Sequence, residues 1–318
     1  MRRWMIAALI AALAPALALA AFPERPLRVL VGFPAGGAGD FTARIIADMG
    51  AAALGQNAVV ENRTGANGAI AAEVVARTGG DGHTVFQCPM GTMTIAPNLP
   101  GQRLPVDVTA EIIPIANLAF STYGFVVAAN SRFQSVAQVL AEARAKPGAL
   151  TFASAGIGSA QHLAGEMLKR MAAIDIVHVP FRGGAPAIVD IIGGRVDFMI
   201  TNLGDVSGQL RDGSMRLLAV ADETGHPGFP AEPISKTVPG YGISGWFGLC
   251  GARGMPAEAV AGWARALEQG LANPQWSKRL LDQGLTPQFE GPQALAARIE
   301  RNRAQFRELI GAAGIRAE

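Results

Sequence analysis

Two glycine-rich stretches of the sequence contain residues that can bind an anion. GFPAGGAGD occupies positions 32–40 and ASAGIGSAQH occupies positions 153–162. Glycine permits positive φ angles, so consecutive backbone N–H groups can point into one concavity that binds a carboxylate or a phosphate. Ser154 and Ser159 add hydroxyl groups that donate or accept hydrogen bonds. A tight turn without a ligand is the competing interpretation for either stretch; their occurrence together favours an anion site.

Three polar residues near these stretches have two interpretations each. Asp40 is expected to be the N-cap of a helix that starts at Phe41, and the alternative is that it receives a ligand ammonium group or orders a water molecule. His162 lies one turn into the helix after the second stretch, where it either reaches a ligand or makes a structural hydrogen bond. Arg182, in FRGG, either clamps a carboxylate through two hydrogen bonds or is solvated.

Recognisable catalytic motifs are missing from the sequence. Residues 32–40 do not match G-x-G-x-x-G, and they lack the Lys-Ser/Thr of a P-loop. GDVSG and GISGW do not have the spacing of a nucleophile elbow. The four histidines show no metal-ligand spacing. We therefore expect no enzyme activity, no cofactor and no metal; an exported hydrolase is the weaker alternative.

The first twenty residues have the pattern of a cleavable secretory signal peptide. MRRW supplies two positive charges, an apolar run follows, and residues 18–20 are a small-x-small cleavage site. The apolar run is shorter than the roughly 20 residues of a membrane span, and Pro15 interrupts it. We therefore expect a periplasmic protein that begins, after cleavage, near residue 21.

The charge of the mature chain argues against nucleic acid as a partner. The full chain has 27 basic and 25 acidic residues, and the leader contains two of the basic residues, Arg2 and Arg3, and no acid. Removing the leader leaves 25 of each (27 − 2 = 25), so the formal net charge of +2 falls to 0. No basic stripe remains to neutralise phosphates.

Short apolar strands alternate with amphipathic helices along most of the chain. This order predicts an α/β fold with mostly parallel sheets. Strands are expected at 27–33, 57–62, 83–89, 123–131, 149–154, 174–181, 196–201, 215–222 and 246–252. Helices are expected at 41–54, 65–78, 135–148, 159–172, 185–194, 256–273 and 292–313.

The end of the chain predicts two lobes joined by crossover strands. A strand and two helices follow the second series of strands and helices, which suggests that the C-terminus returns to the first lobe. Lobe 1 is expected to comprise residues 22–123 and 243–318, and lobe 2 residues 124–242. Open α/β sheets bind ligands at the carboxyl ends of their strands, so the two glycine-rich turns would face a cleft between the lobes.

The two cysteines, Cys88 and Cys250, lie on apparent strands. In an exported protein they can pair, but isolated cysteines on strands are more often buried thiols. We expect two unpaired thiols.

Motifs in a fixed order carry a family resemblance. After the leader come PLRVLVGFPAGGAGDFTARIIA, LGQNAVVENRTGANGAIAAEVVA, DGHTVFQ, LTFASAGIGSAQHLAGEMLK, VHVPFRGGAPAIVDIIGGRVDFMITNL and RLLAVAD. Their order and spacing resemble the Bug family, the TctC-like periplasmic substrate-binding proteins of tripartite tricarboxylate transporters. The similarity covers essentially the whole mature chain.

The resemblance implies a two-lobed periplasmic-binding-protein fold of type II (Venus flytrap) with a ligand cleft between the lobes. It also implies a non-catalytic receptor that holds a ligand carboxylate between the first strand–helix loop and the serine-containing loop of the other lobe, partly through water. The candidate ligand-binding residues are Phe33, Ala35, Gly36, Gly37, Asp40, Gly91, Thr92, Ser154, Ala155, Gly156, Gly158, Ser159, His162, Arg182, Gly183 and Asn202.

The sequence departs from the family pattern at several positions. Thr201 stands where the family often has Asp, which disfavours amino-acid ligands with an ammonium group. Gly39 replaces a common Thr or Ser, and Cys88, Pro89 and Met90 replace small polar residues. The methionines favour a ligand with an apolar or aromatic body, or are simply core residues.

Together these observations predict a monomeric periplasmic receptor for a small organic carboxylate, either a di- or tricarboxylate or an aromatic acid. Closure of the lobes would present the ligand to integral-membrane permease subunits. The alternative is a ligand-sensing protein that presents the closed form to a signalling partner.

Overall fold

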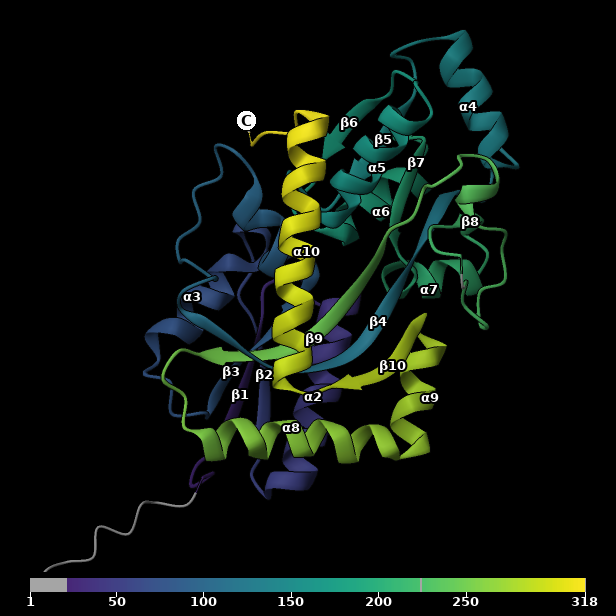
Figure 1. The fold of residues 1–318 in the computed structure, drawn as a ribbon. Coiled ribbons are helices and arrows are strands. Elements are labelled where there is room, and N and C mark those ends of the chain that lie inside the picture. Colours follow the sequence, from purple (N-terminus) through teal and green to yellow (C-terminus); the bar gives the residue numbers. More distant parts are fainter. Residues whose placement is uncertain (1–21, 224, 318) are drawn as a thin grey trace, which may run out of the picture.

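The computed structural model of the chain describes residues 22–223 and 225–317. The predicted signal peptide at residues 1–20 lies outside the described residues. Within the described part, helices that combine the length and the apolar character of a membrane span do not occur. Figure 1 shows strands and helices arranged in two lobes, with the long C-terminal helix running from one toward the other.

The described chain forms ten strands that follow one another in the order β2-β1-β3-β9-β4-β7-β5-β6, with β8 and β10 also paired to β4. The strands are β1 (Leu27–Val31), β2 (Ala58–Asn62), β3 (Thr84–Pro89), β4 (Ile112–Ala128), β5 (Thr151–Ser154), β6 (Val177–Pro180), β7 (Phe198–Asn202), β8 (Met215–Val220), β9 (Ser244–Ala252) and β10 (Leu285–Glu290). Parallel pairs lie at the outer parts of the sheets, and the pairs around β4 and β9 are antiparallel.

Strand β4 belongs to both lobes. From Ile112 to Thr122 it pairs with β9, and from Tyr123 to Ala128 it pairs with β7 or β8. We call the part built on β1, β2, β3, β9, β10 and the first half of β4 lobe 1, and the part built on the second half of β4 with β5–β8 lobe 2. Figure 1 shows β4 and β9 side by side between the lobes.

Nine α-helices of the described chain cover these sheets. They are α2 (Ala38–Leu54), α3 (Ala69–Arg77), α4 (Val136–Ala145), α5 (Ala160–Met171), α6 (Gly184–Ile192), α7 (Leu203–Arg211), α8 (Ala257–Ala272), α9 (Pro274–Asp282) and α10 (Pro292–Ala313). Two glycines show how tightly the layers pack: a Cβ on Gly50 of α2 would lie 2.4 Å from the Trp263 ring of α8, and one on Gly165 of α5 would lie 2.0 Å from the Phe152 ring of β5. Larger residues at these positions would force the helices off their neighbours.

The expected strands and helices are present, and four features differ from the prediction. Strand β4 starts at Ile112 rather than at residue 123, and α7, α9 and β10 were not expected. The sheets are also less parallel than predicted, because the long central strands β4 and β9 run antiparallel to each other.

The expectation of two unpaired thiols is wrong. Cys88 on β3 and Cys250 on β9 form a disulfide across adjacent antiparallel strands, with their Cα atoms 5.8 Å apart. The sequence could not show that these two strands are neighbours, because 162 positions separate the cysteines.

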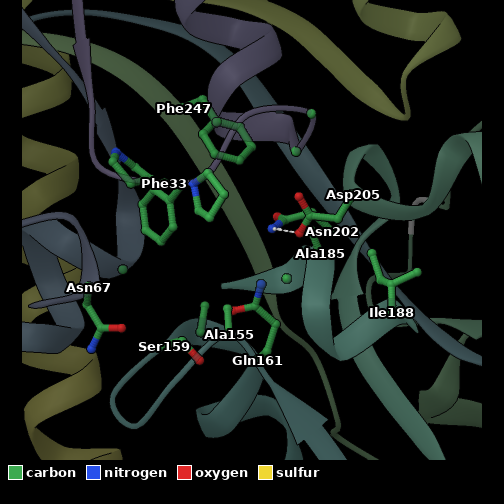
Figure 2. A pocket seen from close by; sticks show the side chains of 18 of the residues that line it. Phe33, Asn67, Ala155, Ser159, Gln161, Ala185, Ile188, Asn202, Asp205 and Phe247 are labelled. Carbon is green, nitrogen blue, oxygen red and sulfur yellow. Dashed lines mark hydrogen bonds between the residues drawn. The ribbon is translucent and has the colours of Figure 1, made fainter. Parts of the chain in front are cut away.

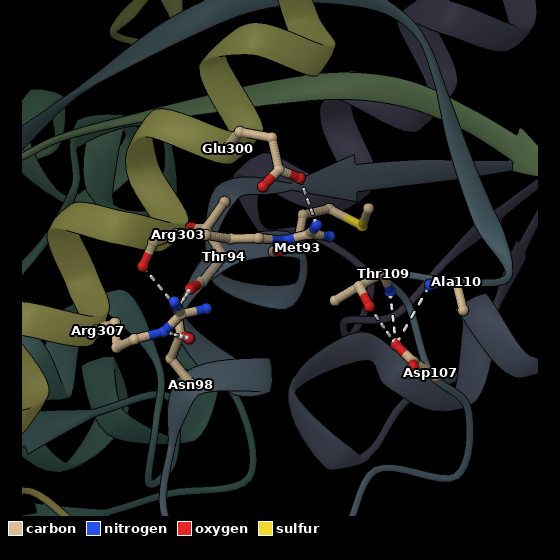
Figure 3. A network of polar contacts seen from close by, with 9 residues as sticks. All are labelled: Met93, Thr94, Asn98, Asp107, Thr109, Ala110, Glu300, Arg303 and Arg307. Carbon is tan, nitrogen blue, oxygen red and sulfur yellow. Dashed lines mark hydrogen bonds and ion pairs between the residues drawn. The ribbon is translucent and has the colours of Figure 1, made fainter.

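Helix α10 fastens the segment that follows β3 (Figure 3). Arg303 donates from Nε to the carbonyl of Met93 at 2.9 Å, and the Asn98 side-chain amide donates to the carbonyls of Thr94 and Arg303. Burial holds the pKa of Arg303 below its usual value, although the nearby carboxylate of Glu300 acts to raise it. These contacts hold the π-helical turn η3 (Gly91–Ile95) against lobe 1.

Candidate ligand-binding site

A cavity of about 300 Å³ lies between the lobes. Phe33, Asn67 and Phe247 border it from lobe 1, and Ser159, Gln161, Ala185, Ile188 and Asp205 border it from lobe 2 (Figure 2). This volume is at the small end of the range for ligand pockets, so the cavity suits a compact molecule.

Four helix N-termini meet at this cavity. Its lining includes Gly37 and Gly39 at the start of α2, Ala160 at the start of α5, Gly184 at the start of α6 and Asn202 before α7. The first backbone N–H groups of a helix have no partner within the helix, and its dipole places partial positive charge there. The cavity is therefore suited to bind an anion through backbone groups.

The turn between β1 and α2 is fixed by Asp40. Helix α2 begins at Ala38 with Gly37 as its N-cap, so the expectation that Asp40 is an N-cap is wrong. Asp40 lies in the first turn instead, and its carboxylate accepts hydrogen bonds from the Gly36 amide, Arg44 and Asn62. Burial acts to raise the pKa of Asp40, but these hydrogen bonds hold it below its usual value.

The second glycine-rich turn is held in a similar way from behind. Ser159 is the N-cap of α5 and accepts a hydrogen bond from the His162 amide at 3.2 Å. The Gly158 amide donates to His162 Nδ1, and Ser154 Oγ lies 2.7 Å from His178 Nε2. Gly156 and Gly158 have φ angles of 131° and 75°, which favour glycine.

The two histidines behind this turn form a buried stacked pair. The rings of His162 and His178 lie 4.0 Å apart between centroids, with an interplanar angle of 12°. Burial lowers the pKa of His162 to about 4. Burial, together with the neighbouring His162, lowers the pKa of His178 to about 3. Both rings are therefore neutral at neutral pH, and neither borders the cavity.

One acidic side chain lines the cavity. Asp205 lies in the first turn of α7, and its Oδ1 accepts a hydrogen bond from the Ala38 amide of lobe 1 at 2.9 Å. Its Oδ2 accepts from Thr201 Oγ1 at 2.9 Å and from Asn202 Nδ2 at 3.1 Å. Asn202 Oδ1 in turn accepts from Ser121. Asp205 thus joins α7 to the N-terminus of α2.

Apolar side chains form the other walls. Lobe 2 contributes one face of α6, and lobe 1 contributes aromatic residues of β9 and the first turn. Val189 and Ile192 are unusual because they are large, apolar and 60% and 37% exposed. The apolar lining consists of Phe33, Pro34, Met90, Ile188, Val189, Ile192, Trp246 and Phe247.

The candidate residues divide into two groups. The following line the cavity: Phe33, Ala35, Gly36, Gly37, Gly91, Thr92, Ala155, Ser159 and Asn202. The remaining candidates do not line it: Asp40, Ser154, Gly156, Gly158, His162, Arg182 and Gly183. Most residues of this second group lie within or against the two turns, on the side away from the cavity, and hold their conformation. Arg182 is exposed to solvent.

Sequence reasoning missed several residues of the lining. The most important are Asn67, Gln161, Asp205 and the apolar residues of α6 and β9. Helix α6 begins at Gly184, directly after the predicted candidate Gly183, so the sequence indicated this turn but not the apolar side chains that follow it in the helix. The sequence does not identify Trp246 and Phe247 as lining residues, because an apolar run is expected equally for a buried strand and for a strand that lines a pocket.

Comparison with known proteins assigns the family. The family model described as tripartite tricarboxylate transporter family receptor matches residues 42–315. The chain belongs to this receptor family. The receptor is 34% identical, over 92% of its length and 87% of the relative's, to the UPF0065 protein in the tcbD–tcbE intergenic region of Pseudomonas sp. strain P51.

Solved structures agree with this assignment. The receptor superposes with a TM-score of 0.88 on R. palustris Rpa4515 with adipate, at 29% identity, covering 93% of this chain and 99% of that one. It superposes with a TM-score of 0.87 on the periplasmic binding protein BugD, at 28% identity, covering 93% and 100%. The expected two-lobed periplasmic-binding-protein fold of the Bug type is confirmed.

Proposed function

We propose that this receptor captures a small organic carboxylate between its lobes in the periplasm and delivers it, without chemical conversion, to the integral-membrane permease subunits of a tripartite tricarboxylate transporter. The observation that carries the proposal is the convergence of four helix N-termini on one small cavity. Backbone N–H groups at helix N-termini are effective ligands for a carboxylate.

Free backbone donors support this assignment. In the described chain the amides of Gly37 and Gly39 in lobe 1, and those of Ala160 and Gln161 in lobe 2, have no intramolecular acceptor. All four residues line the cavity. A carboxylate between them would satisfy donors from both lobes at once and thereby favour the closed arrangement. The Ser159 hydroxyl, at the same edge, adds a further donor.

The related structures support the class of ligand and the location. Rpa4515, which shares the fold over almost its whole length, was solved with adipate, a dicarboxylate. BugD is a periplasmic binding protein. We assign the candidate residues that do not line the cavity, Arg182 excepted, the role of holding the two turns in shape. We assign a monomeric state, with no nucleic acid as partner.

The pairing of β4 supports the proposed lobe boundaries. We place residues 22–123 and 243–318 in lobe 1, and residues 124–242 in lobe 2. Strand β4 changes partners at Tyr123, and the Ile243 amide donates to the Ala221 carbonyl just before β9 begins. The two crossings of the chain are thus adjacent, as a hinge between closing lobes requires.

Thermal unfolding in the presence of mono-, di- and tricarboxylates, aromatic acids and amino acids tests the function. We expect at least one carboxylate to raise the melting temperature, with affinity then measured by calorimetry. Gly37→Val should abolish that shift, because its Cβ alone would lie 3.2 Å from Asp205 Oδ1 and the rest of the side chain would enter the cavity. Gly208→Val is the matched control, since Gly208 lies on an exposed face of α7 with open space around it. Stabilisation by a neutral sugar or a metal, and by no carboxylate, would refute the proposal.

A further inference from the structure

We propose that the ligand is an apolar zwitterion, a small monocarboxylate that carries a protonated nitrogen, and that Asp205 selects it by accepting a hydrogen bond from that nitrogen. An apolar or aromatic α-amino acid is the simplest member of this class. The inference rests on the proposed function and narrows its substrate class.

Asp205 has one acceptor position left for a ligand. A carboxylate accepts about four hydrogen bonds, roughly two at each oxygen. Oδ2 already accepts two, from Thr201 and Asn202, whereas Oδ1 accepts one, from the Ala38 amide. Asp205 is half-buried and borders the cavity, between Gly37 and Gly184. The unused position on Oδ1 is therefore available to a donor in the cavity.

The charge of the lining favours a ligand with its own positive group. Among the described residues that line the cavity, none is Lys, Arg or His, and Asp205 is the only one with a formal charge. Its neighbours at the α2 and α7 N-termini are neutral dipoles that hold the carboxylate without cancelling it. A trianion would meet this charge in a small, partly desolvated space, where like charges repel strongly. An ammonium group would pair with it.

The carboxylate of the ligand has a separate place. Asp205 uses the first amide of α2, Ala38, but it leaves free the amides of Ala160 and Gln161 at the start of α5. The amides of Gly37 and Gly39 are also free. A molecule with a carboxylate beside an ammonium group can therefore bind the free amides through its carboxylate and Asp205 through its ammonium group at the same time.

The apolar walls determine the rest of the molecule. Ile188, Val189 and Ile192 of α6, together with Trp246 and Phe247 of β9, line the cavity. The exposure of Val189 and Ile192 leaves apolar surface that a ligand would cover. These walls offer no partner to a second or third carboxylate, and they fit an aliphatic or aromatic body.

The position of Asp205 revises an expectation from the sequence. Thr201, in place of an acid, disfavoured ligands with an ammonium group. In the fold, Asp205 lies 4 positions after Thr201 of β7, in the first turn of α7, and its Oδ2 is 2.9 Å from Thr201 Oγ1. The acid has not been lost from this region of the cavity; it is supplied from the first turn of α7.

Matched probes test the inference. Phenylalanine, 3-phenyllactate and 3-phenylpropanoate share the apolar body and the carboxylate, and they differ only in an ammonium group, a hydroxyl or hydrogen at one carbon; leucine and 4-methylpentanoate form an aliphatic pair. By calorimetry we expect at least one amino acid to bind about tenfold or more tightly than its analogue without nitrogen. Phenyllactate should fall between, and citrate should bind most weakly.

Asp205→Asn provides the second arm. Asparagine keeps an oxygen for the Ala38 amide but has no charge, so the preference for the amino acid should shrink about tenfold or more. Asp212→Asn, on an exposed acid at the end of the same helix, should leave the preference unchanged. Circular dichroism and melting temperature establish that both variants are folded.

The outcomes separate the two proposals. Tight binding of citrate or of phenylpropanoate, with no gain from the ammonium group, would overturn this inference and leave the carboxylate receptor intact. An equal preference for the amino acid over its analogue without nitrogen in wild type and in Asp205→Asn would also overturn this inference and leave the carboxylate receptor intact. Failure of every carboxylate, zwitterions included, would overturn both.

Discussion

The side-chain amide of Asn67 donates a hydrogen bond of 2.5 Å to the carbonyl of Ile157, which lies 90 positions later in the chain. Asn67 belongs to lobe 1 and Ile157 to the glycine-rich turn of lobe 2. Together with the bond from the Ala38 amide to Asp205, this contact joins the lobes directly beside the cavity. Each glycine-rich turn thus makes one hydrogen bond to the other lobe, through Ala38 to Asp205 of α7 and through Ile157 to Asn67 of η2 (Ala66–Gly68).

Asn67→Ala should favour a more open arrangement of the lobes. Loss of one hydrogen bond shifts the balance by about 0.5–1.5 kcal/mol, so ligand affinity should fall about two- to tenfold. Calorimetry measures the affinity, and small-angle scattering should show a larger radius of gyration without ligand. Asn130→Ala, at an exposed turn of lobe 2, is the control. Unchanged affinity and radius in Asn67→Ala would show that this bond has no influence on closure.

The stacked histidines should make the protein less stable in mild acid. Their pKa values are about 4 and about 3 in the folded chain, against about 6.5 unfolded. Between these values the unfolded chain binds more protons, so the free energy of unfolding falls as pH drops from about 6.5 toward 4. The loss in the free energy of unfolding should be about 2–3 kcal/mol for His162 alone. Burial raises the pKa of Glu166, and the proton that this carboxyl takes up in the folded chain offsets part of that loss.

Urea unfolding of wild type and His178→Gln between pH 7.5 and 4.5 measures this effect. The variant should be less stable at pH 7.5, because Ser154 loses its hydrogen bond to the His178 ring and His162 loses its stacking partner. It should also lose less stability on acidification than wild type does. Parallel pH profiles for the two proteins would contradict the assignment. His226, whose pKa burial also lowers, should contribute to the slope in both.

Removal of the disulfide should destabilise the fold while leaving the cavity lining intact. The double variant Cys88→Ala, Cys250→Ala frees a loop of 162 positions, so the free energy of unfolding should fall by about 2–5 kcal/mol. Chemical denaturation checks this against wild type with and without a reductant. Wild-type stability that is insensitive to reductant would argue against the bond.

Ser159→Ala should weaken both the fold and ligand binding. The Ser159 hydroxyl caps α5 through the His162 amide, and loss of such a cap costs about 1 kcal/mol of stability. The same hydroxyl borders the cavity, so affinity should fall about two- to tenfold. Ser159→Thr keeps the hydroxyl and should restore most of the stability. A variant with lowered stability and unaltered affinity would reduce Ser159 to a capping residue.

The sequence predicted those parts of the fold whose signals are local. Helix α10 was expected at 292–313 and occupies Pro292–Ala313, because Pro at its start and Gly314 after its end mark both boundaries. Only the second half of strand β4 was expected. Its first half is buried on both sides and carries Pro114 and polar residues, so its sequence lacks the alternation of apolar and polar residues that indicates a strand. Helix α9 is not among the expected helices, although Asn273 and Pro274 at its start are residues typical of a helix N-terminus.

The site was less accessible to sequence reasoning, for two reasons. Glycine turns reveal where a backbone bends, but not which of their residues face a cavity. The sequence therefore does not distinguish Gly156 and Gly158, which do not line the cavity, from the residues that do. Asp205 and Asn67 act across lobes, and their partners Ala38 and Ile157 lie far away in sequence. The cysteine pair escaped for the same reason, since it depends on β3 and β9 being neighbours.

Strand β9 lies between β3 and β4 in the finished sheet, yet it is synthesised long after both. Until it emerges, the apolar strands of lobe 1 lack their central neighbour and cannot close a core. Pairings between such distant segments form slowly. A chain whose first lobe depends on a strand from its last third is therefore expected to complete that lobe only after β9 has been synthesised.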